Sequence, residues 1–258
     1  MLGRMLAALA ALPLQAAGIS GPSAREGGDD VVALGDTWVH LVDSVGSREG
    51  PTYLSLHENE QTAVAAARQV AERHGGRLME LRAQRKRLVT FMLAGTHYAF
   101  DPNRIFTSGG IARTLRRYGP YSPNAHAAVG QLAAAILARA AGRADAPLVA
   151  VHNNTAGDLS IASYRPGGTL HSEAAQVATS PARDPDDFFL VTESHVFERL
   201  RALSFNVALQ SPTATDDGSL SVYCQGRLPY VNVEARFGHF AEQVRMLEAV
   251  HAALRVKG

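Results

Sequence analysis

The stretch from Pro51 to Gln61, PTYLSLHENEQ, is the part of the chain on which the expected fold and function depend. It begins as a short apolar run, typical of a buried strand, and continues with polar residues that open a helix. His57 ends the strand, and Glu60 follows three residues later, a spacing that can place an imidazole and a carboxylate on one metal ion. Taken alone this HxxE spacing is common by chance. His57 could bond backbone at the helix entry, and Glu60 could be the negative charge favoured in a first helical turn.

The composition of the 258-residue chain is that of an ordinary globular domain, with 46% hydrophobic and 19% charged residues. The 25 basic residues nearly balance the 24 acidic ones, and no Lys/Arg-rich block is present, so nucleic acid is not expected as a partner. The single cysteine, Cys224, excludes a disulfide framework and a cysteine-based zinc site within one chain. Any metal ion would therefore have to bind histidine and carboxylate side chains.

The N-terminal segment has the layout of a secretory signal peptide. Residues 1–18 contain one basic residue, Arg4, followed by a Leu/Ala-rich run and small residues. This run is too short for a transmembrane span, so we expect none in the mature chain. The alternatives are an amphipathic helix and a start site assigned too early. The protein is predicted to be periplasmic or secreted, or cytoplasmic if the start site is misassigned. Residues 19–36 are predicted to form a linker, which leaves 37–258 as the folded domain.

The rest of the chain alternates predicted strands with predicted helices. Some strands, such as Leu148–Val151, are apolar throughout, which indicates burial on both faces. Helices are expected near 60–74, 124–141 and 239–254 because apolar residues recur there at helical spacing. Leu220–Cys224 is expected to be one of several short strands. This pattern predicts an α/β sheet that is covered by helices on both faces.

Three chemically active side chains stand at the ends of apolar strands, namely His57, His152 and Glu234. Ligands of α/β sheets bind at the carboxyl ends of the strands. Hydrolytic zinc is commonly held by two histidines and a carboxylate, a set that His57, Glu60 and His152 can supply. Glu234 can then act as the base that accepts a proton from water. The run Asp184–Asp187 lacks the spacing of a calcium loop and is interpreted as a solvated turn.

The order of motifs around these residues resembles the zinc carboxypeptidase superfamily, and most closely its succinylglutamate desuccinylase and aspartoacylase branch. After HxxE come a D-x-N-R-x-F loop at 101–106, a strand-end HNNT at 152–155 and a late strand that ends in Glu234. The resemblance covers about residues 53–239. It implies a three-layer α/β/α sandwich with a mixed, mostly parallel central sheet.

The resemblance also implies a role for each matching position. Three residues would bind a single Zn²⁺ ion: His57, Glu60 and His152. Glu234 would be the catalytic base, and Asn103 and Arg104 would hold a carboxylate of the substrate, for which the guanidinium fork is suited. The expected activity is zinc-dependent hydrolysis of an amide bond, with a peptidoglycan stem peptide or another short peptide favoured if the chain is exported. The alternatives are a deacylase of a small N-acyl amino acid and a non-catalytic metal-binding relative.

The chain departs from the branch at several positions. Leu56 and Glu58 stand where the branch usually has glycine on either side of the first histidine. The Glu58 carboxylate could lie close to the metal ion or turn away into solvent. A second substrate-binding arginine, expected upstream of the D-x-N-R loop, has no counterpart by position. The active-site tyrosine of the branch could be Tyr164 or Tyr223.

Overall fold

The computed structural model of the chain describes residues 29–255, except 47–48, 141–146, 156 and 158. The predicted signal peptide lies outside the described residues, and so does the first part of the predicted linker. The last part of that linker range forms a strand, β1 (Asp30–Leu34), whose sequence DVVAL contains the β-branched residues that favour strands. The sheet therefore includes residues upstream of position 37. Among the described residues, no helix has both the length and the apolar character that a membrane span requires.

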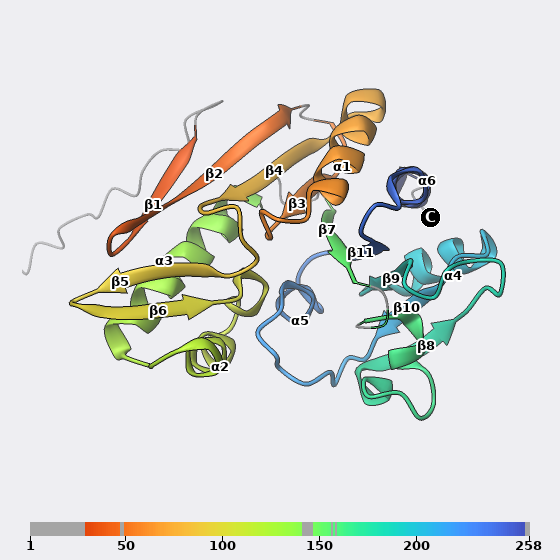
Figure 1. Ribbon diagram of the computed structural model, residues 1–258. Coiled ribbons are helices and arrows are strands. Elements are labelled where there is room, and N and C mark those ends of the chain that lie inside the picture. The colour runs from red at the N-terminus through yellow and green to blue at the C-terminus, as the bar shows by residue number, and fades with distance from the viewer. Residues whose placement is uncertain (1–28, 47–48, 141–146, 156, 158, 256–258) are drawn as a thin grey trace, which may run out of the picture.

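A nine-stranded mixed sheet forms the centre of the molecule (Figure 1). Its spatial order is β1, β2 (Thr37–Gly46), β4 (Arg77–Arg82), β3 (Thr52–Ser55), β7 (Leu148–Asn154), β11 (Tyr230–Arg236), β9 (Phe188–Val191), β10 (Val207–Gln210) and β8 (Ala174–Ala178). The four neighbours β4, β3, β7 and β11 are mutually parallel. Only β2, β9 and β10 run in the opposite direction to the other six strands. The predicted mixed, mostly parallel sheet is confirmed.

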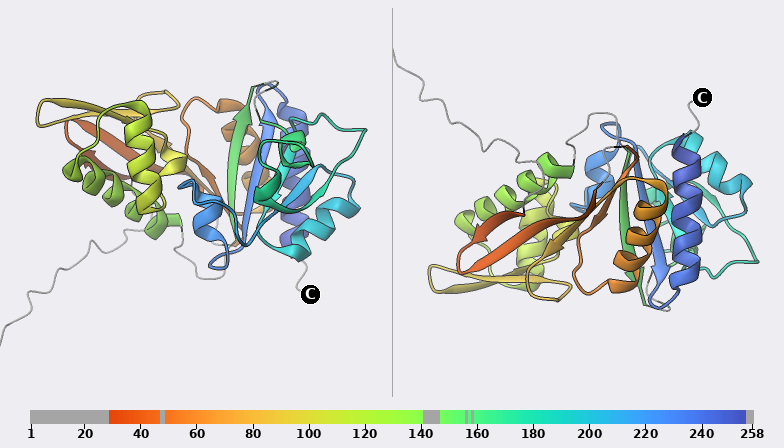
Figure 2. Two further views of the ribbon diagram at one scale, coloured as in Figure 1. Left: turned by 90° about the horizontal axis from the view of Figure 1, so that it is seen from below. Right: turned by 90° about the horizontal axis from the view of Figure 1, so that it is seen from above.

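Helices cover both faces of this sheet, as the two views of Figure 2 show. On one face α1 (Gln61–His74) packs against α6 (Phe240–Arg255), and α6 packs against α4 (Ser194–Ala202). On the other face lie α3 (Pro123–Ala140), α2 (Ser108–Tyr118) and the short α5 (Leu220–Cys224). A separate hairpin of β5 (Val89–Leu93) and β6 (Thr96–Phe100) packs near β1, β2 and α2. The layers agree with the expected α/β/α arrangement.

Side chains of the central strands alternate between two hydrophobic cores. The core under α1 and α6 receives Val149, Val151, Val231 and Val233. The core on the opposite face receives Ala150 and Tyr230 from the same strands. Because side chains alternate along a strand, His152 and Glu234 point to this second face, where the carboxyl end of the sheet becomes polar. The pattern that builds the cores therefore also directs two of the predicted site residues to one place.

The segment Leu220–Cys224 was expected to be a strand, and this prediction is wrong: it forms α5. Its alternating Leu-Ser-Val-Tyr-Cys sequence suits either structure. The residue before it decides the outcome, since the Ser219 side chain accepts a hydrogen bond from the backbone N–H of Val222 and caps a helix. By contrast, the helices expected near 60–74, 124–141 and 239–254 are confirmed as α1, α3 and α6.

Candidate metal centre and active site

The turn between β3 and α1 carries His57 and Glu60. Leu56, directly after the strand, is fully buried in the core beside α3, so an apolar anchor stands where glycine was expected. The backbone N–H of Glu60 donates to the carbonyl of His57 at 3.1 Å, which closes the turn into the helix. Both side chains are almost completely buried, with 1% and 2% of their surfaces exposed. The turn therefore directs an imidazole and a carboxylate into the protein interior.

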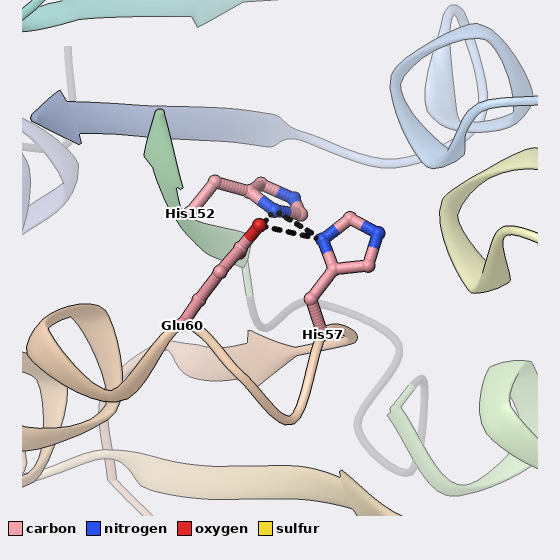
Figure 3. A group of neighbouring side chains, drawn as sticks. All are labelled: His57, Glu60 and His152. Atoms are coloured by element: carbon pink, nitrogen blue, oxygen red, sulfur yellow. Dashed lines mark hydrogen bonds and ion pairs between the residues drawn. The ribbon is translucent and has the colours of Figure 1, made fainter. Parts of the chain in front are cut away.

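The side chains of His57, Glu60 and His152 converge on one point (Figure 3). One carboxylate oxygen of Glu60 lies 2.9 Å from Nδ1 of His57, and the other lies 2.9 Å from Nδ1 of His152. The two Nδ1 atoms are 3.2 Å apart. Tetrahedral coordination with bonds of 2.0–2.1 Å separates neighbouring ligand atoms by about 3.3 Å. Small shifts of these three side chains would therefore place them around one ion.

Asp101 holds a proton on Nε2 of His57. Its Oδ1 lies 2.8 Å from Nε2 of His57, and because an ionised carboxylate only accepts, Nε2 must donate. Nδ1 is then left to face the point shared with Glu60 and His152. A carboxylate behind a histidine is the arrangement that commonly orients histidine ligands of metals. Two imidazoles and a carboxylate, with one imidazole oriented in this way, are a donor set that fits zinc.

The charges in this cluster stabilise one another. Burial disfavours a charged His57, but the carboxylates of Glu60 and Asp101 outweigh burial and raise the pKa of His57 to about 9. Burial likewise disfavours the Glu60 carboxylate, but His152 and His57 reverse this effect and hold the pKa of Glu60 well below its usual range. Glu60 is therefore ionised at neutral pH, as a carboxylate ligand must be.

Glu234 lies beside His152, because β7 and β11 pair in a register that places these two residues opposite one another. Its side chain is buried, and its Oε1 accepts a hydrogen bond from Nδ2 of Asn232 at 2.9 Å. Burial raises the pKa of Glu234, His152 opposes that shift, and the nearby Glu60 carboxylate adds to it. A buried carboxylate with a raised pKa beside such a cluster is suited to accept a proton.

The D-x-N-R segment places Asn103 and Arg104 next to the cluster, on the turn η1 (Pro102–Arg104). Oδ1 of Asp101 accepts from the backbone N–H of Asn103 at 2.8 Å, in addition to its bond with His57. Oδ1 of Asn103 accepts from the backbone N–H of Leu220 at 3.1 Å, which leaves its Nδ2 as the donor for a ligand. The Arg104 side chain is 40% exposed. Asn103 is thus linked to the candidate metal centre through Asp101, and Arg104 follows it on the same turn.

Glu58 turns away from the three converging side chains. Its Oε2 accepts hydrogen bonds from the backbone N–H groups of Ala83 at 2.8 Å and Arg85 at 2.5 Å. Both donors belong to the loop between β4 and β5, and Arg85 has a φ of +55°, a conformation that needs such local support. Glu58 thus turns away from the candidate metal centre, as the second alternative expected, but it bonds the β4–β5 loop instead of pointing into solvent.

The same loop supplies an arginine that the sequence did not single out. Nη1 of Arg87 donates to Glu60 at 2.6 Å, and Nη2 lies 3.8 Å from Oδ2 of Asp101. The Arg87 side chain is half exposed, so its guanidinium reaches the cluster from the solvent side. Nothing in the spacing around Arg87 indicates this contact, because it joins two loops that are distant in sequence.

Tyr164 lies in the electrostatic surroundings of the site, whereas Tyr223 contacts Arg227 on the surface of α5. Tyr164 is buried in a small core that includes Phe188. Burial raises the pKa of Tyr164, the charge of Glu234 adds to the increase, and the charge of Arg104 opposes it. Of the two tyrosines considered from the sequence, Tyr164 is therefore the one within electrostatic range of Glu234 and Arg104.

The acidic run at 184–187 is not a solvated turn. Asp187 is 3% exposed, and its Oδ1 accepts from the backbone N–H of Arg236 at 2.8 Å. Its Oδ2 lies 3.0 Å from Nδ1 of His239. Asp184, Asp187 and His239 are close enough to hold a cation, but the Arg236 guanidinium already lies 3.4 Å from Asp184. The run joins the start of β9 to the end of β11 and so has a structural role.

No protein-family model matches the chain, and no curated protein matches it either. Among solved structures it is similar to a gene product of Agrobacterium tumefaciens, with a TM-score of 0.43 and 16% identity over 80% of this chain and 89% of that one. It is also similar to a succinylglutamate desuccinylase/aspartoacylase family protein from Shewanella amazonensis, with a TM-score of 0.43 and 10% identity over 88% of this chain and 72% of that one. For an aspartoacylase family protein from Mesorhizobium loti, the TM-score is 0.39 and the identity is 16%, over 90% of this chain and 67% of that one. The branch that the sequence resembles is represented among these structures, but the assignment of function depends on the site.

Proposed function

We propose that the chain is a zinc-dependent hydrolase of an amide bond, either a peptide or an N-acyl bond, in a substrate with a free carboxylate. The observation that supports this most strongly is the convergence of Glu60 with Nδ1 of His57 and Nδ1 of His152, all within 3.2 Å of one another. Their burial and the bond from His57 to Asp101 indicate an ordered, pre-arranged donor set. We assign one ion to these three residues.

Each remaining residue has a chemical task in this proposal. A bound zinc ion would supply Lewis acidity, which polarises a carbonyl group and makes water more acidic. Glu234 accepts the proton of the attacking water on its carboxylate and passes it to the leaving nitrogen. Nδ2 of Asn103 and the guanidinium of Arg104 hold the carboxylate of the substrate. Two donors on adjacent residues match the two oxygens of that group.

Two classes of substrate fit these tasks. If the predicted signal peptide directs export, a short peptide such as a peptidoglycan stem peptide is favoured. A small N-acyl amino acid is the second candidate, on the strength of the motif order at 101–106 and 152–155. A relative without turnover would have been favoured if Leu56 and Glu58 had obstructed the centre. Leu56 instead packs in the core, and Glu58 bonds the β4–β5 loop.

The test combines metal analysis with activity on short peptides and N-acyl amino acids. We expect about one zinc ion per purified chain, retained in Glu234→Gln, together with a loss of 10²-fold or more in kcat, typical of a missing general base. Glu198→Gln is the matched control, because Glu198 is an exposed carboxylate that pairs with Arg201 on α4. A chain without metal would refute the hydrolase. If Glu234→Gln holds zinc and remains fully active, the assigned base is wrong and the metal centre stands.

A further inference from the structure

The loop between β10 and α5 is fixed against the two residues that hold the substrate's carboxylate. The backbone N–H of Phe106 donates to the carbonyl of Gly218 at 3.0 Å, and that of Leu220 donates to Asn103. Gly218 has a φ of +84°, and a Cβ at this position would lie 2.5 Å from the carbonyl oxygen of Arg104. Only glycine permits such a close approach in this conformation. The loop is therefore built to lie beside Arg104.

This loop places Asp217 at one edge of the Arg104 guanidinium. Oδ1 of Asp217 accepts from the backbone N–H of Ser219 at 2.9 Å, and Oδ2 lies 3.5 Å from Nε of Arg104. Nη1 of Arg104 donates to the carbonyl of Asn103 at 2.7 Å. Nε thus faces a carboxylate of the protein and Nη1 faces a backbone carbonyl, so Nη2 is the nitrogen that is left for a ligand. The Asp217 side chain is 46% exposed, so its charge is open to a ligand on Arg104.

Carboxylates predominate among the charges that act on Tyr164 together with this arginine, whereas the Arg87 guanidinium acts with Arg104 on Asp101. The charged groups that act on the buried Tyr164 include the carboxylates of Glu234, Asp217 and Glu173, against the guanidinium of Arg104. One substrate carboxylate can bind to Arg104. A second carboxylate on the substrate would be repelled by Asp217 and Glu234, because the charges that act on Tyr164 include no cation other than Arg104. A positive group on the substrate would be attracted to the same two carboxylates.

We infer that Asp217 determines specificity: its fixed negative charge beside Arg104 selects substrates that carry a cationic side chain next to the bound carboxylate. This inference rests on the proposed function and defines its substrate class more closely. It favours a peptide or N-acyl compound whose terminal residue is a diamino or other basic amino acid. It disfavours N-acyl dicarboxylic amino acids, and within each of the two candidate classes it selects substrates by the charge of the terminal residue.

If Asp217 served only to orient the Arg104 side chain, a different result would be expected. If Asp217 only held Arg104 in place, its loss would weaken binding of all carboxylate substrates by the same factor. A charge-selecting role changes the ratio between substrates of different charge. Asp217→Asn is the appropriate variant, because its amide oxygen can still accept from Ser219 while the charge is removed.

The experiment compares the zinc-loaded enzyme on substrates that differ only in the terminal residue: lysine, norleucine or glutamate, each joined to an acetyl or an alanyl group. We expect kcat/KM to fall from lysine to norleucine to glutamate. In Asp217→Asn the ratio of kcat/KM for lysine to that for glutamate should fall by about twofold to fivefold, the range of an exposed ion pair, and the change should appear in KM. The ratio should also shrink with added salt in the wild type.

Asp216→Asn is the matched control. Asp216 is the neighbouring carboxylate of the same loop, 48% exposed, but it pairs with Arg113 and Thr107 instead of Arg104. Its substitution should leave the ratio of lysine to glutamate unchanged. Dissociation constants measured by calorimetry with metal-loaded Glu234→Gln, with and without Asp217→Asn, isolate the contribution of Asp217 without turnover, because the Glu234 charge is absent from both proteins.

The inference is overturned if the wild type prefers the glutamate compounds, or if Asp217→Asn keeps the wild-type ratio. Absence of binding by all three compounds would overturn it together with the role of Arg104. These outcomes differ from failure of the hydrolase itself, which would show as missing metal or as an unaffected Glu234→Gln variant.

Discussion

Asp101 connects the candidate metal centre to the residues that bind carboxylate, and its substitution is the sharpest test of the centre. Its Oδ1 accepts from Nε2 of His57 at 2.8 Å and from the backbone N–H of Asn103 at 2.8 Å. Burial works against its charge, but His57, followed by Arg104 and Arg87, holds the pKa of Asp101 well below its usual range. Asp101 is therefore a charged acceptor at neutral pH, with two donors to satisfy.

The two substitutions Asp101→Asn and Asp101→Ala should weaken zinc binding to different extents. The carboxamide keeps an oxygen for both donors but loses the charge, so we expect the lower end of the usual effect for a group behind a ligand, about tenfold. Alanine removes the acceptor and leaves Nε2 of His57 unsupported, for which about 100-fold is expected. These factors correspond to about 1.4 and 2.8 kcal/mol of binding free energy.

The assay is competition for zinc between the purified chain and a chromophoric chelator at fixed pH. Asp36→Asn is the control, because Asp36 is also an aspartate that accepts from a backbone N–H, that of Met92, on the β5–β6 hairpin. Thermal unfolding in excess chelator shows whether the metal-free variants remain folded. Equal zinc affinity for wild type and Asp101→Ala would refute the claim that Asp101 supports His57 as a zinc ligand. In that case His57 would bind zinc without help from Asp101, or it would not bind zinc at all.

Three other predictions concern the loops and the base. Gly218→Ala should destabilise the chain by about 1–3 kcal/mol and raise KM, because of its positive φ and the nearby Arg104 carbonyl. Gly226→Ala, with a φ of +69° and no neighbour within 4 Å, should cost less in thermal unfolding and leave KM unchanged. Glu58→Ala should lower the free energy of unfolding by about 1–2 kcal/mol, because two backbone N–H groups lose their acceptor; no change in the denaturant midpoint would contradict this. Since burial raises the pKa of Glu234, kcat/KM should fall with decreasing pH through a midpoint above the ordinary glutamate value of about 4.3, and a midpoint at or below that value would argue against Glu234 as the base.

The sequence predicted which side chains come together because these residues lie on regular elements or in one tight turn. His152 and Glu234 each follow an apolar strand, and strand alternation together with parallel pairing places them side by side. His57 and Glu60 belong to one tight turn, so their spacing in sequence fixes their spacing in the structure. In each case a local pattern or a simple rule of sheets determines where the side chain lies.

The parts that the sequence did not predict depend on contacts between loops. Arg87 reaches Glu60, and Asp217 reaches Arg104, from loops that are far away along the chain. Neither residue has a periodic pattern around it, and an isolated arginine or aspartate in a polar loop is most often simply solvated. Glu58 is a similar case, because its partners are backbone N–H groups, which carry no signature in the sequence.

The two hydrogen bonds of Asp101 have a consequence for the distance between the two halves of the proposed site. A single carboxylate oxygen bonds His57, a proposed ligand, and the backbone of Asn103, a proposed carboxylate donor. The separation between the ion and the bound carboxylate is therefore set by the short turn around Asp101 and not by a flexible connection. A substrate that occupies both positions must present its amide carbonyl at a fixed distance from its free carboxylate. In the proposed function, this arrangement would favour cleavage next to a terminal residue over cleavage within a long peptide, and Asp217 would then select which terminal residue is accepted.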